Sequence, residues 1–80
     1  MKGIQCKLAR VALGWGVLEL ASAANVSTQT ITRLERGETL RPTTLRAIQE
    51  VLERNGIEFI AEDSHAGVGV RFSHVESKNV

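Results

Sequence analysis

Polar residues that can hydrogen-bond to base edges line one face of a predicted helix over residues 28–36, whose apolar positions are Ile31 and Leu34. With these two turned inward, the outward face has no acidic residue and carries Thr28, Gln29, Thr32, Arg33 and Arg36. Gln can pair with adenine and Arg with guanine through two hydrogen bonds, and a Thr methyl can touch thymine. The pattern favours a nucleic-acid surface; the alternative is a polar face that is only solvated.

A tight connection places this helix against a shorter one, predicted over residues 17–24. Asn25 suits a turn that needs positive φ, and Ser27 and Gly37 suit the N-cap and the position after the C-cap of the second helix. Ala21 is small enough for a close approach of the two helices. A shared core is expected from the apolar residues Leu20, Val26, Ile31 and Leu34. This is the geometry of a helix-turn-helix, whose second helix enters a DNA major groove.

The rest of the chain predicts two further helices and, after Gly56, a change in the spacing of apolar residues. A first helix shows an apolar stripe of Ile4, Leu8 and Val11 or Ala12, with Cys6, Arg10 and Leu13 adjoining it. A fourth helix begins after Thr43 as a possible N-cap and stops at Asn55-Gly56. The period then becomes two, which predicts strands near residues 57–61 and 67–72. We expect a DNA-binding domain over 1–56, a hairpin over 57–73 and a flexible tail over 74–80.

The sequence resembles the Cro/phage-repressor (Xre-type) helix-turn-helix family over roughly residues 6–55. The resemblance rests on Arg10-Val-Ala-Leu-Gly, Glu19-Leu-Ala, the run from Val26 to Gly37, Arg41-Pro and Leu45. It implies a mainly α fold, a four-helix lambda-repressor-like helix-turn-helix domain, to which this chain adds a C-terminal β-hairpin. It also implies a regulator that binds double-stranded DNA, and no cofactor is expected. The single Cys6 and the lack of a signal-peptide-like N-terminus predict a reduced, cytoplasmic protein.

The resemblance assigns roles to individual residues. Base reading falls to Thr28, Gln29, Thr32 and Arg33. Contacts to the DNA backbone fall to Ser27, Arg36, Thr39, Arg41 and Thr43. Arg10 and Glu35 correspond to a structural ion pair that links the first helix to the end of the third.

The start of the second helix departs from the family. The family usually has Ser or Thr at Gly16 and Gln at Val17, and that Gln contacts the DNA backbone, which Val17 cannot do through its side chain. Leu18 stands where the family is commonly polar. Trp15, Val17 and Leu18 therefore form either an exposed partner surface or local packing around the Gly14–Gly16 turn.

Composition narrows the function further. An 80-residue chain builds one small core, and it has no apolar run of the roughly 20 residues that span a bilayer. Residues 1–56 carry eight Lys/Arg against five Glu, a net charge of +3, whereas residues 57–80 carry −2, which suits a polyanion binder with a separate element. One Cys and two unpaired His, His65 and His74, predict neither a disulfide nor a metal site. We expect no enzyme, since no catalytic arrangement is present.

Association of two chains is expected because one short helix reads too little DNA for useful discrimination. We predict a homodimer on a pseudo-palindromic operator, in which hairpin strands pair through Phe59, Val68, Val70 and Phe72. The competing view is that the hairpin only covers the helical core. A repressor fits best. The alternatives are an activator, an antitoxin or adaptor that binds a protein partner, and an inert remnant of a larger regulator.

Overall fold

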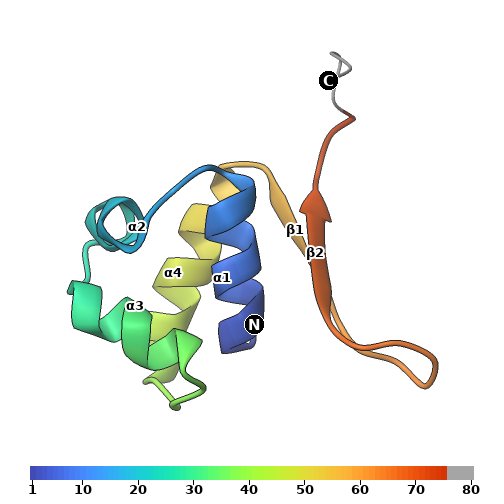
Figure 1. The fold of residues 1–80 in the computed structure, drawn as a ribbon, viewed down its shortest axis with the longest axis horizontal. Helices are drawn as coiled ribbons and strands as arrows, with labels where there is room; N and C mark the ends of the chain where they lie inside the picture. The colour runs from blue at the N-terminus through green and yellow to red at the C-terminus, as the bar shows by residue number, and fades with distance from the viewer. Residues whose placement is uncertain (76–80) are drawn as a thin grey trace.

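Four helices and a two-stranded hairpin make up the fold. The computed structural model describes residues 1–75. Its elements are α1 (Gly3–Ala12), α2 (Val17–Ala24), α3 (Thr28–Glu35), α4 (Pro42–Arg54), β1 (Ile57–Ile60) and β2 (Gly69–Phe72). Figure 1 shows α1 and α4 side by side at the centre, with α2 and α3 on one side and the hairpin on the other. The expected four-helix fold with a C-terminal hairpin is confirmed.

The helix boundaries follow from the capping residues. Asn25 ends α2 with a left-handed φ of 57°, and Gly37 follows the end of α3 with a φ of 97°. Ser27 caps α3, where its Oγ accepts a hydrogen bond from the Thr30 amide at 3.1 Å. These residues fix the turn between α2 and α3 and the direction in which the chain leaves α3.

The predicted start of α4 was wrong. Thr43 does not cap the helix, because α4 begins at Pro42 and Arg41 is the N-cap residue. Proline suits the first helical position, where its missing N–H costs no hydrogen bond and its φ is already near the helical value. Thr43 therefore lies in the first turn of α4, still exposed at the surface.

The core lies between the four helices and β1. Its fully buried side chains are Cys6, Leu20, Ile31, Ile48, Leu52 and Ile57. Ala21 is 3% exposed, as expected for a small residue where α2 and α3 approach closely. Val26 is partly buried and packs against the core. At the start of α1, a Cβ on Gly3 would overlap the Leu34 carbonyl oxygen, so the first turn of α1 lies directly against the end of α3.

The inward face of α1 includes Cys6, which the sequence predicts to be a core residue, but not the predicted apolar stripe. Ile4, Leu8 and Val11 are 51%, 42% and 60% exposed, whereas the buried residues are Gln5, Cys6 and Ala9. The physical reason is the hairpin, which packs beside α1 through a polar residue: the Gln5 amide nitrogen donates to the carbonyl oxygens of Ile60 and Gly69 at 3.1 and 3.0 Å. The helix is thus rotated about its axis relative to the expectation, and its apolar stripe faces outward.

The hairpin is antiparallel and covers the α1–α4 side of the helical core. Ile57 pairs with Phe72 and Phe59 with Val70, so these four share one face. Phe59 and Val70 pack against the helical core, while Phe72 is 37% exposed. On the opposite face, Arg71 donates two hydrogen bonds to Glu58, at 2.9 and 3.1 Å. Both strands are shorter than predicted, since Ala61 and Val68 lie just outside them. Most of the predicted tail, residues 76–80, lies outside the described part of the chain.

Candidate nucleic-acid interface

The outward face of α3 is open to solvent along its length. Its helical register places the apolar Ile31 and Leu34 in the core, at 0% and 4% exposed. The opposite side presents a set of exposed polar residues, all of them expected from the sequence: Thr28, Gln29, Thr32, Arg33 and Arg36. This face is wide enough for several side chains to contact a ligand at once.

Thr32 and Gln29, two of these exposed residues, differ in whether their polar atoms already form hydrogen bonds within the protein. The Thr32 hydroxyl donates to the Gln29 carbonyl oxygen at 3.0 Å, within the helix. This bond fixes the hydroxyl against the helix and leaves the methyl group of Thr32 for apolar contact, as with a thymine methyl. The Gln29 amide makes no hydrogen bond among the residues the structure describes, so both of its polar atoms can meet a ligand.

The loop between α3 and α4 extends this surface. A shallow hollow of about 390 Å³ is lined by residues of α3, the loop and the start of α4, namely Thr30, Arg33, Thr39, Leu40, Arg41 and Thr44. It brings Arg33, expected to read a base, next to Thr39 and Arg41, expected to contact the backbone. Ser27 and Thr43, at the starts of α3 and α4, are exposed as well, although the Ser27 hydroxyl is already bonded within the cap.

A largely buried ion pair holds α3 against α1. Arg10 Nε and Nη2 donate to the two carboxylate oxygens of Glu35 at 2.8 and 2.9 Å, and the side chains are only 14% and 10% exposed. A third nitrogen, Nη1, reaches the Trp15 carbonyl oxygen at 3.3 Å. The hydrogen bonds to Glu35 raise the pKa of Arg10 above its ordinary value. The pair joins the first helix to the last residue of α3 and so sets the orientation of the exposed face.

The thiol of Cys6 lies beside the same carboxylate. Its Sγ donates to Glu35 Oε2 at 3.5 Å, and the residue is fully buried. Burial, together with the negative charge of Glu35, raises the pKa of the Cys6 thiol to about 12. Cys6 is therefore a neutral core residue at neutral pH, since an apolar, acidic surrounding disfavours the thiolate.

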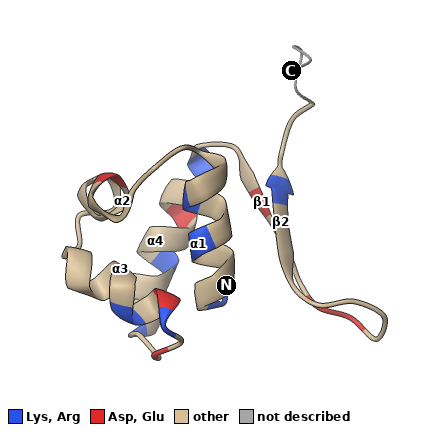
Figure 2. Cartoon of the chain, viewed as in Figure 1, with Lys and Arg blue, Asp and Glu red and all other residues tan. Residues whose placement is uncertain are grey.

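A residue that the sequence reasoning missed is Glu38, at the C-terminal end of α3. Its carboxylate accepts from Arg33 Nε at 2.9 Å and from Arg36 Nη2 at 2.7 Å, so both outward arginines of α3 are paired with it. Figure 2 shows acidic and basic positions next to one another at the end of α3 and in the loop that follows it. The signal in the sequence was Gly37, because a left-handed turn after Arg36 returns the next side chain toward the helix.

The apolar residues at the start of α2 are mostly packed. Trp15 and Val17 are partly buried against the core, while Leu18 is 71% exposed. Gly16 has no side chain that could cap the first-turn amides of α2, but the carboxylate of Glu19 accepts from the Gly16 amide at 2.9 Å, which is the other half of a capping box. The packing alternative therefore holds for Trp15 and Val17, and one exposed leucine remains.

Two observations concern other kinds of site. Within residues 1–75, no group of three or more His, Cys, Asp or Glu side chains gathers in a way that could bind a metal ion. No helix of that part is both long and apolar enough to cross a membrane.

The arrangement of α2, the Asn25 turn and α3 is that of a helix-turn-helix protein, and a comparison with known families agrees. The helix-turn-helix family HTH_3, of the Cro/C1 or Xre-like type, matches residues 7–59, which is more than half of the chain. The protein belongs to this family. Its domain is that of DNA-binding transcription regulators in general, a regulatory rather than a typically catalytic domain. No curated protein shows significant similarity to this sequence.

Proposed function

We propose that this protein is a sequence-specific transcriptional repressor that reads DNA through the outward face of α3. The observation that carries the proposal is the exposed row of Thr28, Gln29, Thr32 and Arg33, on the second helix of a helix-turn-helix. These side chains can make base contacts in a major groove, and in this proposal Arg36, Thr39, Arg41 and Thr43 contact the flanking phosphates. Repression follows from occupancy, since a protein bound across a promoter blocks polymerase.

The test is selection of bound duplexes from a random pool, with the full chain and with two variants. Arg33→Ala removes a base-reading group and should relax the preference at one base pair while leaving the rest of the site unchanged. Arg41→Ala removes a backbone contact and should weaken binding to all sequences and reduce the slope of log K against log salt by about 1. An unchanged base preference in Arg33→Ala would show that α3 does not read the site.

The protein acts as a homodimer in this proposal. The hairpin supports it, because within residues 1–75 β2 pairs with β1 and with no other strand, its one charged residue is Arg71, and Phe72 is 37% exposed. The outward stripe of α1, made of Ile4, Leu8 and Val11, adds apolar surface on the element beside β2. Of the expected interface residues, Phe59 and Val70 already pack on their own core, so Phe72 and the strand edge next to Val68 remain for a second copy.

Sedimentation of the full chain tests the dimer. The wild type should sediment as a dimer at tens of micromolar without DNA, and Phe72→Ser should shift it toward monomer. Leu18→Ser is the matched control, because Leu18 is an equally apolar, more exposed residue on α2, away from the hairpin. A wild type that stays monomeric at that concentration contradicts the hairpin dimer but not DNA binding.

A further inference from the structure

Glu38 holds the two cationic side chains that the outward face of α3 offers to DNA. Its two carboxylate oxygens are divided between them, one on Arg33 and one on Arg36. All three side chains are well exposed, at 50%, 67% and 43% for Arg33, Arg36 and Glu38. The hydrogen bonds from Arg33 and then Arg36 lower the pKa of Glu38, so it is ionised at neutral pH. The carboxylate of Glu38 thus occupies the arginine side chains that an anionic ligand such as DNA would bind.

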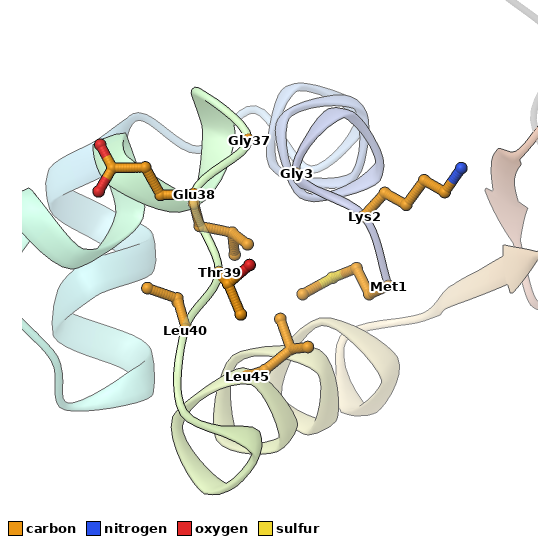
Figure 3. Close-up of a pocket in the computed structure, with 9 residues that line it drawn as sticks. Met1, Lys2, Gly3, Gly37, Glu38, Thr39, Leu40 and Leu45 are labelled. Atoms are coloured by element: carbon orange, nitrogen blue, oxygen red, sulfur yellow. The ribbon is translucent and has the colours of Figure 1, made fainter.

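The backbone fixes the position of this carboxylate. Gly37 N donates to the Leu34 carbonyl at 2.9 Å, and Glu38 N donates to the Arg33 carbonyl at 3.0 Å, which closes the end of α3. Figure 3 shows that Glu38 is among the residues that line the neighbouring cavity of about 310 Å³ but that its carboxylate points away from the centre, into which Met1, Thr39 and Leu45 project. Packing in that cavity therefore does not account for the direction of Glu38; its contacts with the arginines do.

We propose that Glu38 is a specificity-determining residue, an internal competitor that makes binding to non-cognate DNA less favourable than binding to the operator. The inference rests on the proposed function. A carboxylate presents two acceptors to an arginine, as guanine does with O6 and N7. At the operator, Arg33 exchanges Glu38 for a guanine edge, while Arg36 stays with the carboxylate and compensates its charge. The exchange replaces the one acceptor that Glu38 gives to Arg33, Oε1, with the two acceptors of the guanine edge, so Arg33 loses no hydrogen bond.

Non-cognate DNA offers no such replacement. There both arginines gain only phosphate contacts, which are electrostatic and independent of sequence. If both arginines leave Glu38, its carboxylate has no cationic partner and repels the nearby phosphates. If both arginines stay with Glu38, their two contacts to the phosphates are not made. Either way the unfavourable effect of Glu38 is larger on non-cognate DNA than at the operator.

The experiment compares Glu38→Gln with the wild type on two duplexes, the selected operator and a scrambled duplex, between 50 and 200 mM salt. Glutamine keeps an acceptor oxygen and removes the charge. We expect binding to the scrambled duplex to tighten about five- to tenfold, and its log K–log salt slope to steepen by about 1. Binding to the operator should tighten only about twofold, so the ratio of the two affinities falls.

The matched control is Glu58→Gln. Glu58 has a similar exposure, 46% against 43%, and also pairs with an arginine, but it lies on the outer face of the hairpin. This variant changes the net charge equally and should leave the affinity ratio as in the wild type. An unchanged ratio in Glu38→Gln, or an equal fall in both variants, overturns the inference while the DNA-binding proposal stands. A wild type that prefers no duplex overturns both.

Discussion

Two arginine–glutamate clusters lie on different sides of α3 and differ chiefly in their access to water. On the inner flank, Arg10 and Glu35 are at most 14% exposed, and each has its polar atoms bonded inside the protein. On the outer face, Glu38 and its two arginines are 43% to 67% exposed. The same chemistry therefore has two consequences, because a desolvated pair is costly to break, whereas a solvated one exchanges partners easily.

The largest effect expected from this contrast is the loss of the inner pair. Arg10→Met or Glu35→Gln alone leaves a partly buried charge without its partner and should lower the free energy of unfolding by about 3–5 kcal/mol. The double variant should lose less than the sum, because neither charge is then left alone. Denaturant unfolding of the two single variants and the double variant measures this coupling. Losses that simply add would mean that the two side chains do not stabilise each other.

The outer cluster should respond in binding rather than in folding. Arg33→Ala should cost about 1–3 kcal/mol of affinity for the preferred duplex, since it removes a two-bond contact to a base. Its melting temperature should remain close to that of the wild type, because an exposed ion pair contributes little to stability. Fluorescence anisotropy titrations and thermal melts of the same sample separate the two quantities. A large drop in melting temperature would assign Arg33 a structural role instead.

The inner and outer sides of α3 also differ in how far the sequence alone predicts them. The helix-turn-helix was predictable because its signals are local: Asn25 for a left-handed turn, Ser27 for a cap, and Ile31 and Leu34 for the buried face. The exposed row on α3 follows from that register alone. Each of these predictions needed residues only a few positions apart.

Features that depend on distant segments were not predictable in the same way. The rotation of α1 is set by Gln5, a polar residue buried because it bonds to the hairpin about 55 and 64 residues further on. A hydrophobic pattern alone places Ile4 and Leu8 inside, since it does not register a buried amide with satisfied hydrogen bonds. Glu38 is different: its position follows from Gly37 locally, but its importance appears only once both arginine partners are seen.

The salt dependence of stability should also distinguish the two clusters, although the expected change is smaller than those above. At 1 M salt the screening length falls to about 3 Å, which weakens solvated ion pairs and leaves desolvated ones nearly intact. Glu38→Gln should therefore shift the melting temperature by less than about 2 °C at low salt and by nothing measurable at high salt. The destabilisation of Arg10→Met should be about the same under both conditions. A salt-dependent loss in Arg10→Met would place the inner pair in solvent.

The smallest effect is expected from the titration of Cys6, which does not change stability at neutral pH, and it tests whether water is excluded from the inner cluster. Burial beside Glu35 raises the pKa of this thiol to about 12, against 9.0 as its ordinary value. Because the folded state binds the proton more tightly, the neutral thiol contributes its stability fully below pH 9, and this contribution declines as the pH rises from about 9 toward 12. Cys6→Ala removes this titration, so its stability should decline less steeply over that range, although packing loss makes it less stable at pH 7.

Thiol labelling gives the second measurement of the same feature. In the folded wild type at pH 8, a thiol reagent should react only at the rate of unfolding, because Cys6 is fully buried and protonated, and it should react at once in denaturant. Rapid labelling under native conditions would mean that water reaches Glu35 and Arg10 as well. The two arginine–glutamate clusters would then no longer differ in solvation, and the large loss expected for Arg10→Met would shrink to that of a surface pair.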